Sequence, residues 1–542
     1  MKCSLKHSLF ISLSVLLFLN ACIAKSPKID SIDPRIGSLG EVLTIRGQYF
    51  GNERGENYIT IGGIVPTASA YIQWQNDLIA LRTPDFGDSG LVYVYVNGKR
   101  SNPSLFTNRS IMPQRIADTQ SGSGPTLSGL SPVSGKIGSL VTLQGSNLGA
   151  SRDKAKVFFN WNSEHSLTAV ENPNQNQKMV EVSETEFGYE YWSDREIRVR
   201  VPDGAISGAV QVRTAQGTSI PLFFDVVDKP GTTVFKDRRS FAISYGVDIK
   251  VQKALAPNTL YIWIPLPLTN ARQRISQQLG RSVEPFVDNY LGSSLFQLKD
   301  LQSEQEQTIK TSYLVEVYAV ETTVKAQSIK RDPNTPIQMA YTQSSSLIPS
   351  DNPEIQKKAN AIVGKEKNPY IQAQRLYEWL TAQGSIVQGP VTTNLIEAMN
   401  KQELDAYTAA LLFCAMARSL NIPAIPNAGI LINKERETRK HYWAEFWIDG
   451  FGWIPVDPAM GASAVPESFM FRNDAPTYYF GNVDSQRISF SRGIINLSPM
   501  DPKGKIVQRN REYALQNIWE ESTGTLESYS SLWSDIIVTG VY

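Results

Sequence analysis

An internal duplication constrains this chain more than any other feature of its sequence. The stretch at 34–51 matches the stretch at 132–149 at a constant offset of 98 residues. The matched positions are glycines with one proline and one threonine: Pro34, Gly37, Gly40, Thr44, Gly47 and Gly51 fall on Pro132, Gly135, Gly138, Thr142, Gly145 and Gly149. Self-similarity at a fixed spacing indicates one structural module present twice. We therefore expect two copies of the same small domain before residue 230.

The match continues further along each copy, but at an offset of 118 residues: Trp74, Ile79, Pro84, Gly90, Val92 and Val94 fall on Trp192, Ile197, Pro202, Gly208, Val210 and Val212. The second copy therefore carries a 20-residue insertion, which we place in the polar stretch between Trp161 and Tyr191. Alternating runs such as 91–96 predict strands with one buried face, and the spaced Gly and Pro residues set the turns. This pattern predicts two small β-sandwiches.

The duplicated pattern resembles the IPT/TIG family of immunoglobulin-like domains, over 27–106 and 126–228. Such domains serve as spacers or as binding surfaces, and the fold alone does not decide between these roles. The segment between them, 107–125, is rich in Gly, Ser and Gln and is typical of a flexible linker.

A third β-rich segment spans 229–340, where six apolar residues alternate with other residues: Phe241, Ile243, Tyr245, Val247, Ile249 and Val251. The stretches 259–267 and 311–324 give further strand signals. Beyond Asp351 the apolar spacing becomes that of helices. Pro353 suits a first helical turn, and two apolar stripes follow it: Ile355, Ala359 and Ile362, then Ala373, Leu376, Tyr377 and Leu380.

The candidate catalytic residues of this chain lie in three motifs between 405 and 457. A helix is predicted over 405–420, ending before Asn421-Ile422-Pro423, because Asn suits a left-handed cap and Pro cannot continue a helix. The motifs H-Y-W-A-E-F-W at 441–447 and G-W-I-P-V-D at 452–457 predict two neighbouring strands, which present His441 and Asp457.

These motifs resemble the transglutaminase-like superfamily, a papain-like fold in which a helix-start Cys attacks an amide, a His activates it and an Asp orients the His. The matching positions are Ala410, Leu412, Phe413, Arg418, Ile422, Pro423, His441, Trp443, Glu445, Gly452, Trp453 and Asp457, with Asn421 where the family has Gly. The resemblance covers 341–465. The W-I-P-L-P run within 229–340 resembles the β domain that often precedes such cores, a third unrelated sandwich being the alternative. The C-terminal extension, 466–542, resembles an addition found in some bacterial members at 478–481 and 487–493.

The expected fold is thus multidomain, with two immunoglobulin-like β-sandwiches, a further β domain and an α+β transglutaminase-like domain. The family's nucleophile position falls on Ala406, counting back from Arg418 and Ile422-Pro423. Acyl transfer by this route needs a thiolate at a helix N-terminus. Losing the nucleophile of a related triad costs about 10⁶ in kcat. Cys414 lies about 12 Å further along the helix, on a stripe expected to face the core, where a free Cys behaves as a small hydrophobe.

His441 and Asp457 remain of the triad, and two interpretations are open. In the first, the pair only supports the fold or binds a ligand in the cleft where the family binds its substrate. In the second, His441 is a base that activates water or a substrate group, and general-base help of this kind raises a reaction rate by about 10²- to 10⁴-fold. We expect no cofactor and no metal. A His-rich zinc site is excluded because only His165 and His441 follow the leader, although a carboxylate site for calcium is not.

The N-terminus predicts export and a lipid anchor. Residues 1–21 have a basic start, an apolar run over 9–19 that is too short to span a bilayer, and Ala21 before Cys22. The sequence at 19–22, L-N-A-C, resembles the lipobox of bacterial lipoproteins, which implies lipidation of Cys22, with 22–26 as a tether. The residue after Cys22 is Ile23, whereas an Asp there would favour retention of a lipoprotein at the inner membrane. The expected location is therefore the outer membrane or the cell surface.

Without residues 1–21 the chain has 51 basic and 52 acidic residues, a balance that gives no reason to expect nucleic-acid binding. Cys414 is then left without a disulfide partner. We therefore expect an envelope-anchored binding or scaffolding lipoprotein with a catalytically dead transglutaminase-like domain, a pseudoenzyme whose cleft holds a peptide, protein or glycan. The alternatives are an active amidase or peptidase with an atypical nucleophile and a purely structural spacer.

Overall fold

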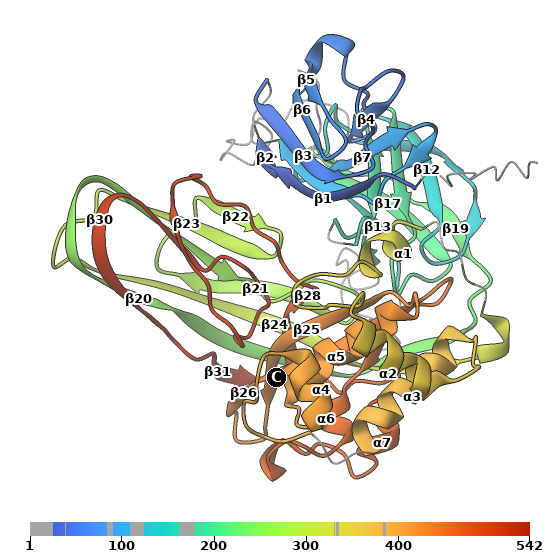
Figure 1. The fold of residues 1–542 in the computed structure, drawn as a ribbon, viewed down its shortest axis with the longest axis vertical. Helices are drawn as coiled ribbons and strands as arrows, with labels where there is room; N and C mark the ends of the chain where they lie inside the picture. Colours follow the sequence, from blue (N-terminus) through green and yellow to red (C-terminus); the bar gives the residue numbers. More distant parts are fainter. Residues whose placement is uncertain are drawn as a thin grey trace, which may run out of the picture.

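A computed structural model describes residues 25–37, 40–83, 90–108, 124–161, 179–184, 186–329, 331, 335–382 and 386–542 of the chain. The leader, Cys22 and most of the 107–125 linker lie outside the described residues, as does His165. The fold class predicted from the sequence is confirmed, since strands dominate and the α-helices of the described residues lie between Pro336 and Tyr478. Figure 1 shows these helices gathered below the two N-terminal sandwiches.

Both duplicated modules are β-sandwiches with the same strand order. In the first, one sheet has the order β1 (Lys28–Asp33), β3 (Val42–Gln48), β6 (Leu78–Arg82), β5 (Tyr71–Trp74), and the other β2 (Ile36–Gly37), β9 (Ser104–Asn108), β7 (Gly90–Val96), β4 (Tyr58–Ile61), with β8 (Lys99–Arg100) paired to β7. In the second, the sheets are β10 (Thr126–Ser131), β12 (Leu140–Ser146), β16 (Glu196–Arg200), β15 (Tyr189–Trp192), and β11 (Ser134–Gly135), β19 (Leu222–Val226), β17 (Gly208–Thr214), β13 (Lys156–Asn160), β14 (Met179–Glu181), with β18 (Gly217–Thr218) paired to β17.

The insertion in the second module docks that module against the rest of the protein. Its described part forms the added edge strand β14 and the turn that carries Glu186 and Phe187. Phe187 contacts the ring of Tyr341, with centroids 5.7 Å apart. The hydrophobic core of the module also runs on without a break into its neighbours, through Trp447 and Trp453. The second module is therefore packed onto the helical region and is not a free spacer.

The β domain is built on one very long strand, β20 (Gly231–Pro265). Its alternating residues from Phe241 to Val251 are buried, as their spacing predicts. On one side β20 pairs with β24 (Glu306–Val324) and β23 (Ser293–Lys299), which carry β21 (Gln273–Arg281) and β22 (Val287–Tyr290). On the other side it pairs with strands from the end of the chain, β30 (Glu520–Trp533) and β31 (Ile537–Val541), and β29 (Lys505–Val507) pairs with β30. Figure 1 shows β20 and β30 extending together away from the helices.

The helical region is inserted between strands of this β domain. Its sheet has the order β27 (Gly452–Val456), β26 (Thr438–Ile448), β25 (Ala424–Ile432), β28 (Arg487–Arg492). The helices are α1 (Pro336–Tyr341), α2 (Pro353–Val363), α3 (Pro369–Ala382), α4 (Leu395–Lys401), α5 (Ala406–Ser419), α6 (Pro458–Gly461) and α7 (Ala475–Tyr478). The buried helix α5 packs on β25 and β26, and the segment 466–542 is divided between this sheet and the β domain.

The helix α5 is the centre of this core. All its residues from Tyr407 to Arg418 are buried, which agrees with the inward stripe predicted for it. Among the described residues, no helix combines the length and the apolar character needed to cross a bilayer.

Candidate functional site

The structure brings His441 and Asp457 together, as the strand motifs predict. His441 lies on β26 and Asp457 follows the end of the adjacent strand β27, where it caps α6. Nε2 of His441 is 2.8 Å from Oδ2 of Asp457, and each side chain is 1% exposed. The other oxygen of Asp457 accepts a hydrogen bond from the backbone N–H of Met460 at 3.0 Å. The carboxylate is therefore held from both sides.

A third residue completes this buried network, and sequence motifs did not identify it as part of the site. Nη1 of Arg487, on β28, is 2.7 Å from the same Oδ2 of Asp457, and its Nη2 is 2.5 Å from Oδ2 of Asp484. The guanidinium also lies over the ring of Trp443, 5.0 Å from its centroid. Burial by itself would raise the pKa of Asp457, but the charges of His441 and Arg487 outweigh burial and hold that pKa at about 2.

The ionised Asp457 determines that the nitrogen of His441 facing it is a donor. A carboxylate without a proton can only accept, so Nε2 of His441 carries the hydrogen and donates it. In a neutral ring the lone pair is then on Nδ1. Among the described residues, no hydrogen bond reaches this Nδ1.

The structure places Ala406 at the first position of α5, facing the same cleft as His441. The helix start is fixed by a capping box: Oδ1 of Asp405 accepts from the N–H of Thr408 at 2.8 Å, and Oγ1 of Thr408 accepts from the N–H of Asp405 at 2.9 Å. The open cleft has a volume of 320 Å³, and Ala406 is half-buried at its wall. Ala406 and His441 thus line the same cleft, and the assignment of position 406 to the family's nucleophile stays a prediction.

The rim of this cleft carries three basic side chains. Lys440 pairs with Glu512 at 2.6 Å, and Arg511 forms an ion pair with Asp405. Arg439 donates from Nη2 to the backbone oxygen of Gln388 at 2.8 Å and forms no ion pair with any described residue. The residues that line the cleft thus carry more positive than negative charge.

Cys414 lies in the core, as its place on the helix predicts. Its side chain is fully buried, and burial raises the pKa of the thiol to about 12. It does not line the cleft around His441. It is therefore neither accessible from the cleft nor ionised at neutral pH.

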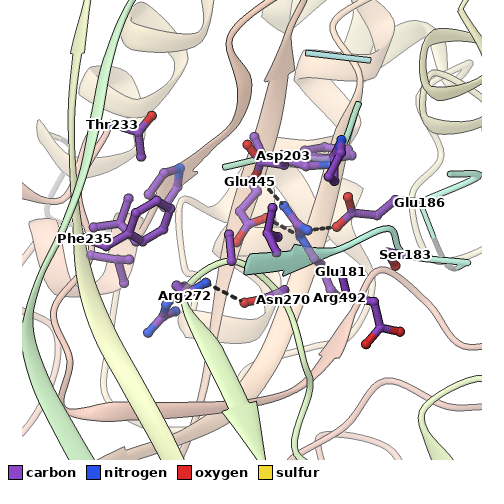
Figure 2. A pocket seen from close by; sticks show the side chains of 17 residues that line it. Glu181, Ser183, Glu186, Asp203, Thr233, Phe235, Asn270, Arg272, Glu445 and Arg492 are labelled. Carbon is purple, nitrogen blue, oxygen red and sulfur yellow. Dashed lines mark hydrogen bonds and ion pairs between the residues drawn. The ribbon is translucent and has the colours of Figure 1, made fainter. Parts of the chain in front are cut away.

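Glu445, which belongs to the predicted H-x-W-x-E motif, lies in a different place, at the junction of three domains (Figure 2). Nε of Arg492 is 2.5 Å from Oε2 of Glu445, and Arg492 also pairs with Glu186 and Asp203 of the second sandwich. Burial raises the pKa of Asp203 to about 6, against the opposing charge of Lys229. The adjoining cavity has a volume of only 40 Å³, so this cluster joins domains and offers little room for a ligand.

We find no group of three or more His, Cys, Asp or Glu side chains arranged for a metal ion within the described part of the chain.

Comparison with known proteins agrees with this architecture. Residues 356–458 match the transglutaminase-like superfamily, and residues 27–108 and 125–225 match the IPT/TIG domain. An uncharacterized protein of Haemophilus influenzae is 24% identical over 298 residues, which cover 47% of this chain and 79% of that protein. The chain therefore carries two TIG domains and a transglutaminase-like domain.

Two solved structures resemble parts of the chain. One, described as a "Putative Cysteine Protease" from Cytophaga hutchinsonii, is 16% identical, covers 57% of this chain and 92% of its own, and has a TM-score of 0.36. The other, a surface glycan-binding protein from Prevotella bryantii, is 10% identical, covers 56% of this chain and 99% of its own, and has a TM-score of 0.15.

Proposed function

We propose that this protein is a lipid-anchored envelope protein whose transglutaminase-like domain binds a ligand in its cleft and does not catalyse acyl transfer. One observation carries the proposal: Ala406 occupies the first turn of α5, in the cleft it shares with His441. Covalent catalysis by this fold requires a thiolate there, and an alanine methyl cannot form a thioester.

The rest of the site is consistent with a retained binding cleft. His441 and Arg487 are buried and both bond to Asp457, so the side chain of His441 is held in place at the wall of the cleft. The cleft itself stays open, with 320 Å³ of space, within the range of about 300 to 1,000 Å³ typical of small-molecule sites. A domain that served only as a spacer would have no need of an open cleft with a preorganised polar wall.

The anchoring half of the proposal rests on the sequence at 19–22 and the cysteine at position 22. Two or three acyl chains bury enough methylene groups for stable attachment, whereas a single chain does not. The second TIG domain shares a hydrophobic core with the transglutaminase-like domain, so the two would lie at the membrane as one rigid unit, without a flexible stalk between them. The first TIG domain also contacts this body, since Nη1 of Arg35 donates to the backbone oxygen of Asn496 at 2.9 Å.

The test is to restore the thiol. In a Cys414→Ser background, Ala406→Cys should alkylate with iodoacetamide faster than Cys414 does in the wild type, because the helix start and the imidazole both favour the thiolate. Adding His441→Ala should slow that reaction. Glu354→Cys, in the exposed first turn of α2, is the matched control for a helix start without an imidazole.

The wild type should show no deamidase, amidase or amine-incorporation activity on a glutamine-donor peptide. Turnover by the wild type that disappears in His441→Ala would refute the non-catalytic assignment and favour His441 as a base acting on water or substrate. If Ala406→Cys alkylates no faster than Glu354→Cys and is insensitive to His441→Ala, the cleft does not have the geometry on which the proposal depends.

A further inference from the structure

A second groove lies where both TIG domains meet the rest of the chain. It has a volume of 330 Å³, and none of its residues also lines the cleft at His441. Four parts of the chain line this groove: the first TIG domain through Leu105, the second through Phe187, the helical region through Gln343 and the C-terminal extension through Ile495. Ligand sites often lie at such junctions and have volumes of about 300 to 1,000 Å³. We call this space the TIG groove.

Two arginines that line the TIG groove have only neutral partners. Nη1 of Arg35 donates to the backbone oxygen of Asn496 at 2.9 Å. Arg418, near the end of α5, donates from Nε to the backbone oxygen of Ala424 and from Nη1 to that of Gln343, both at 2.8 Å. Neither guanidinium forms an ion pair with a carboxylate of the described residues. Burial lowers the pKa of both groups, as expected for a charge that no opposite charge balances.

The other charged side chains that line the TIG groove are already paired. Lys28 is 3.1 Å from Asp30, and both line the groove. Glu184 pairs with Arg152, and Arg492 is held by the three carboxylates of the domain junction. The unbalanced charge is therefore that of the two arginines, and an incoming anion meets no unpaired acidic group of the described chain.

The apolar walls of the groove indicate the kind of anion. Leu105, Ile494 and Ile495 are half-buried and offer aliphatic surface. The rings of Phe187 and Tyr341 contact each other with their planes inclined at 51°, so they do not form one flat platform on which a sugar could stack. A peptide matches this combination, because it can carry carboxylate and aliphatic side chains next to one another.

Polar side chains between these walls suit a peptide backbone. Ser104 and Asn496 line the groove, and neither side chain forms a hydrogen bond with a described residue. A peptide backbone offers donors and acceptors to both side chains, whereas the alkyl chain of a fatty acid offers none.

We infer that the TIG groove binds an acidic segment of a partner protein, whose Asp or Glu carboxylates pair with Arg35 and Arg418 and whose aliphatic side chains pack on the walls. A guanidinium can bind a carboxylate through two parallel hydrogen bonds, which makes it a strong and specific partner. Arg35 keeps Nε and Nη2 for this purpose, and Arg418 keeps Nη2. The inference goes beyond the proposed function, because this second site does not use the cleft at His441.

The experiment is calorimetry of the mature full chain with the capped peptide Ac-Glu-Val-Glu-Val-Glu-NH2 and its neutral counterpart Ac-Gln-Val-Gln-Val-Gln-NH2. We expect the acidic peptide to bind at least about tenfold more tightly than the neutral one, and its affinity to fall as salt is added. Arg35→Gln should weaken binding of the acidic peptide by about tenfold and leave the neutral peptide unchanged. Arg35→Lys, which keeps the charge, should retain part of the affinity.

Two variants serve as matched controls. Arg46→Gln makes the same charge change on an exposed residue of the first TIG domain outside the groove, and Arg439→Gln removes a charge from the cleft at His441. Neither should change the affinity for the acidic peptide. Ser104→Trp, which fills the groove without changing its charge, should abolish binding and keeps the test valid if Arg35→Gln loosens the first TIG domain.

The possible failures are distinct. Equal binding of the two peptides, or unchanged affinity in Ser104→Trp, would overturn the inference. A loss of affinity in Arg439→Gln and none in Arg35→Gln would place the peptide in the cleft at His441, which overturns the second site and supports the proposed function. Tighter binding of trigalacturonate than of the acidic peptide would overturn the choice of a peptide. Absence of binding by either peptide at about 1 mM would overturn the inference and leave the proposed function to the alkylation of Ala406→Cys.

Discussion

The sharpest prediction for the buried network concerns Arg487→Met. Arg487 is completely buried and bridges two carboxylates, at 2.7 Å to Asp457 and 2.5 Å to Asp484. Methionine fills much of the same volume but carries no charge. The substitution leaves both carboxylates in place, away from water, and without the guanidinium that neutralises them.

The expected magnitude follows from the electrostatics. The pKa of Asp457 is lowered from 3.8 to about 2, a net stabilisation of about 2 kcal/mol that remains after the charges of His441 and Arg487 have offset the burial of the carboxylate. Asp484 also has a lowered pKa, for which Arg487 is the leading stabilising cause. Removing one partner of a buried ion pair typically costs about 3–5 kcal/mol. We expect a loss in that range at pH 7.

The pH dependence tests the mechanism. In the wild type, the lowered pKa of Asp457 contributes stability that is complete above its unfolded value of 3.8 and is lost as the pH falls toward about 2. In the variant, Asp457 keeps His441 but loses the charge of Arg487, and Asp484 loses its main opposing charge, so burial raises the pKa of both carboxyls relative to the wild type. Their ionised forms then destabilise the fold at pH 7, and protonation relieves this on acidification. The difference between variant and wild type should therefore shrink from pH 7 to pH 4.5.

Because the chain has several domains, local hydrogen exchange over 441–460 measures this better than one global unfolding curve. Arg472→Met is the matched control: Arg472 is 36% exposed and pairs with Asp474 at 2.7 Å, an interaction expected to contribute at most about 1 kcal/mol. A loss of protection in Arg487→Met no larger than in Arg472→Met, or one that does not shrink at low pH, would refute the reasoning.

Two further predictions concern the domain junction and the anchor. Gly452→Ala should weaken the packing of the second TIG domain, because the glycine has φ +111° and an added methyl would overlap Oδ1 of Asp203. We expect hydrogen-exchange protection to fall over 196–206. The control Gly280→Ala, whose added methyl would meet no neighbouring atom, should leave that protection unchanged. Metabolic labelling with palmitate should mark the wild type and not Cys22→Ala, and label that persists in the variant would exclude lipidation at this cysteine.

Much of the fold could be predicted because it depends on local patterns. The alternation in β20 and the apolar stripes of α2, α3 and α5 each show within a few residues, and the repeat shows by comparison of two stretches of the same sequence. The pairing of His441 with Asp457 could be predicted because adjacent strands of the sheet carry them, 16 residues apart.

The features that could not be predicted depend on contacts between segments that are far apart in the sequence, and no periodic pattern marks such contacts. Arg492 reaches Glu186 across 306 residues, and the insertion that carries Glu186 is polar and resembles a loop in sequence. Arg487 is one arginine among many until β28 is placed beside β25. The final strands gave no indication that they pair with β20, about 270 residues earlier, because alternation specifies a buried face and not a partner.

The pairing of β20 with the last strands of the chain has a consequence for biosynthesis. From Val247 to Ile262 one edge of β20 is completed only by β30, so a growing chain must carry that edge open until residues 520–533 have emerged. Contacts that span 264 to 288 residues form late and slowly. An exposed strand edge of this length is a template for pairing with other chains. A nascent copy that stalls after the helical region would therefore be complete around His441 and still prone to aggregate, until β30 and β31 have emerged and closed the edge of β20.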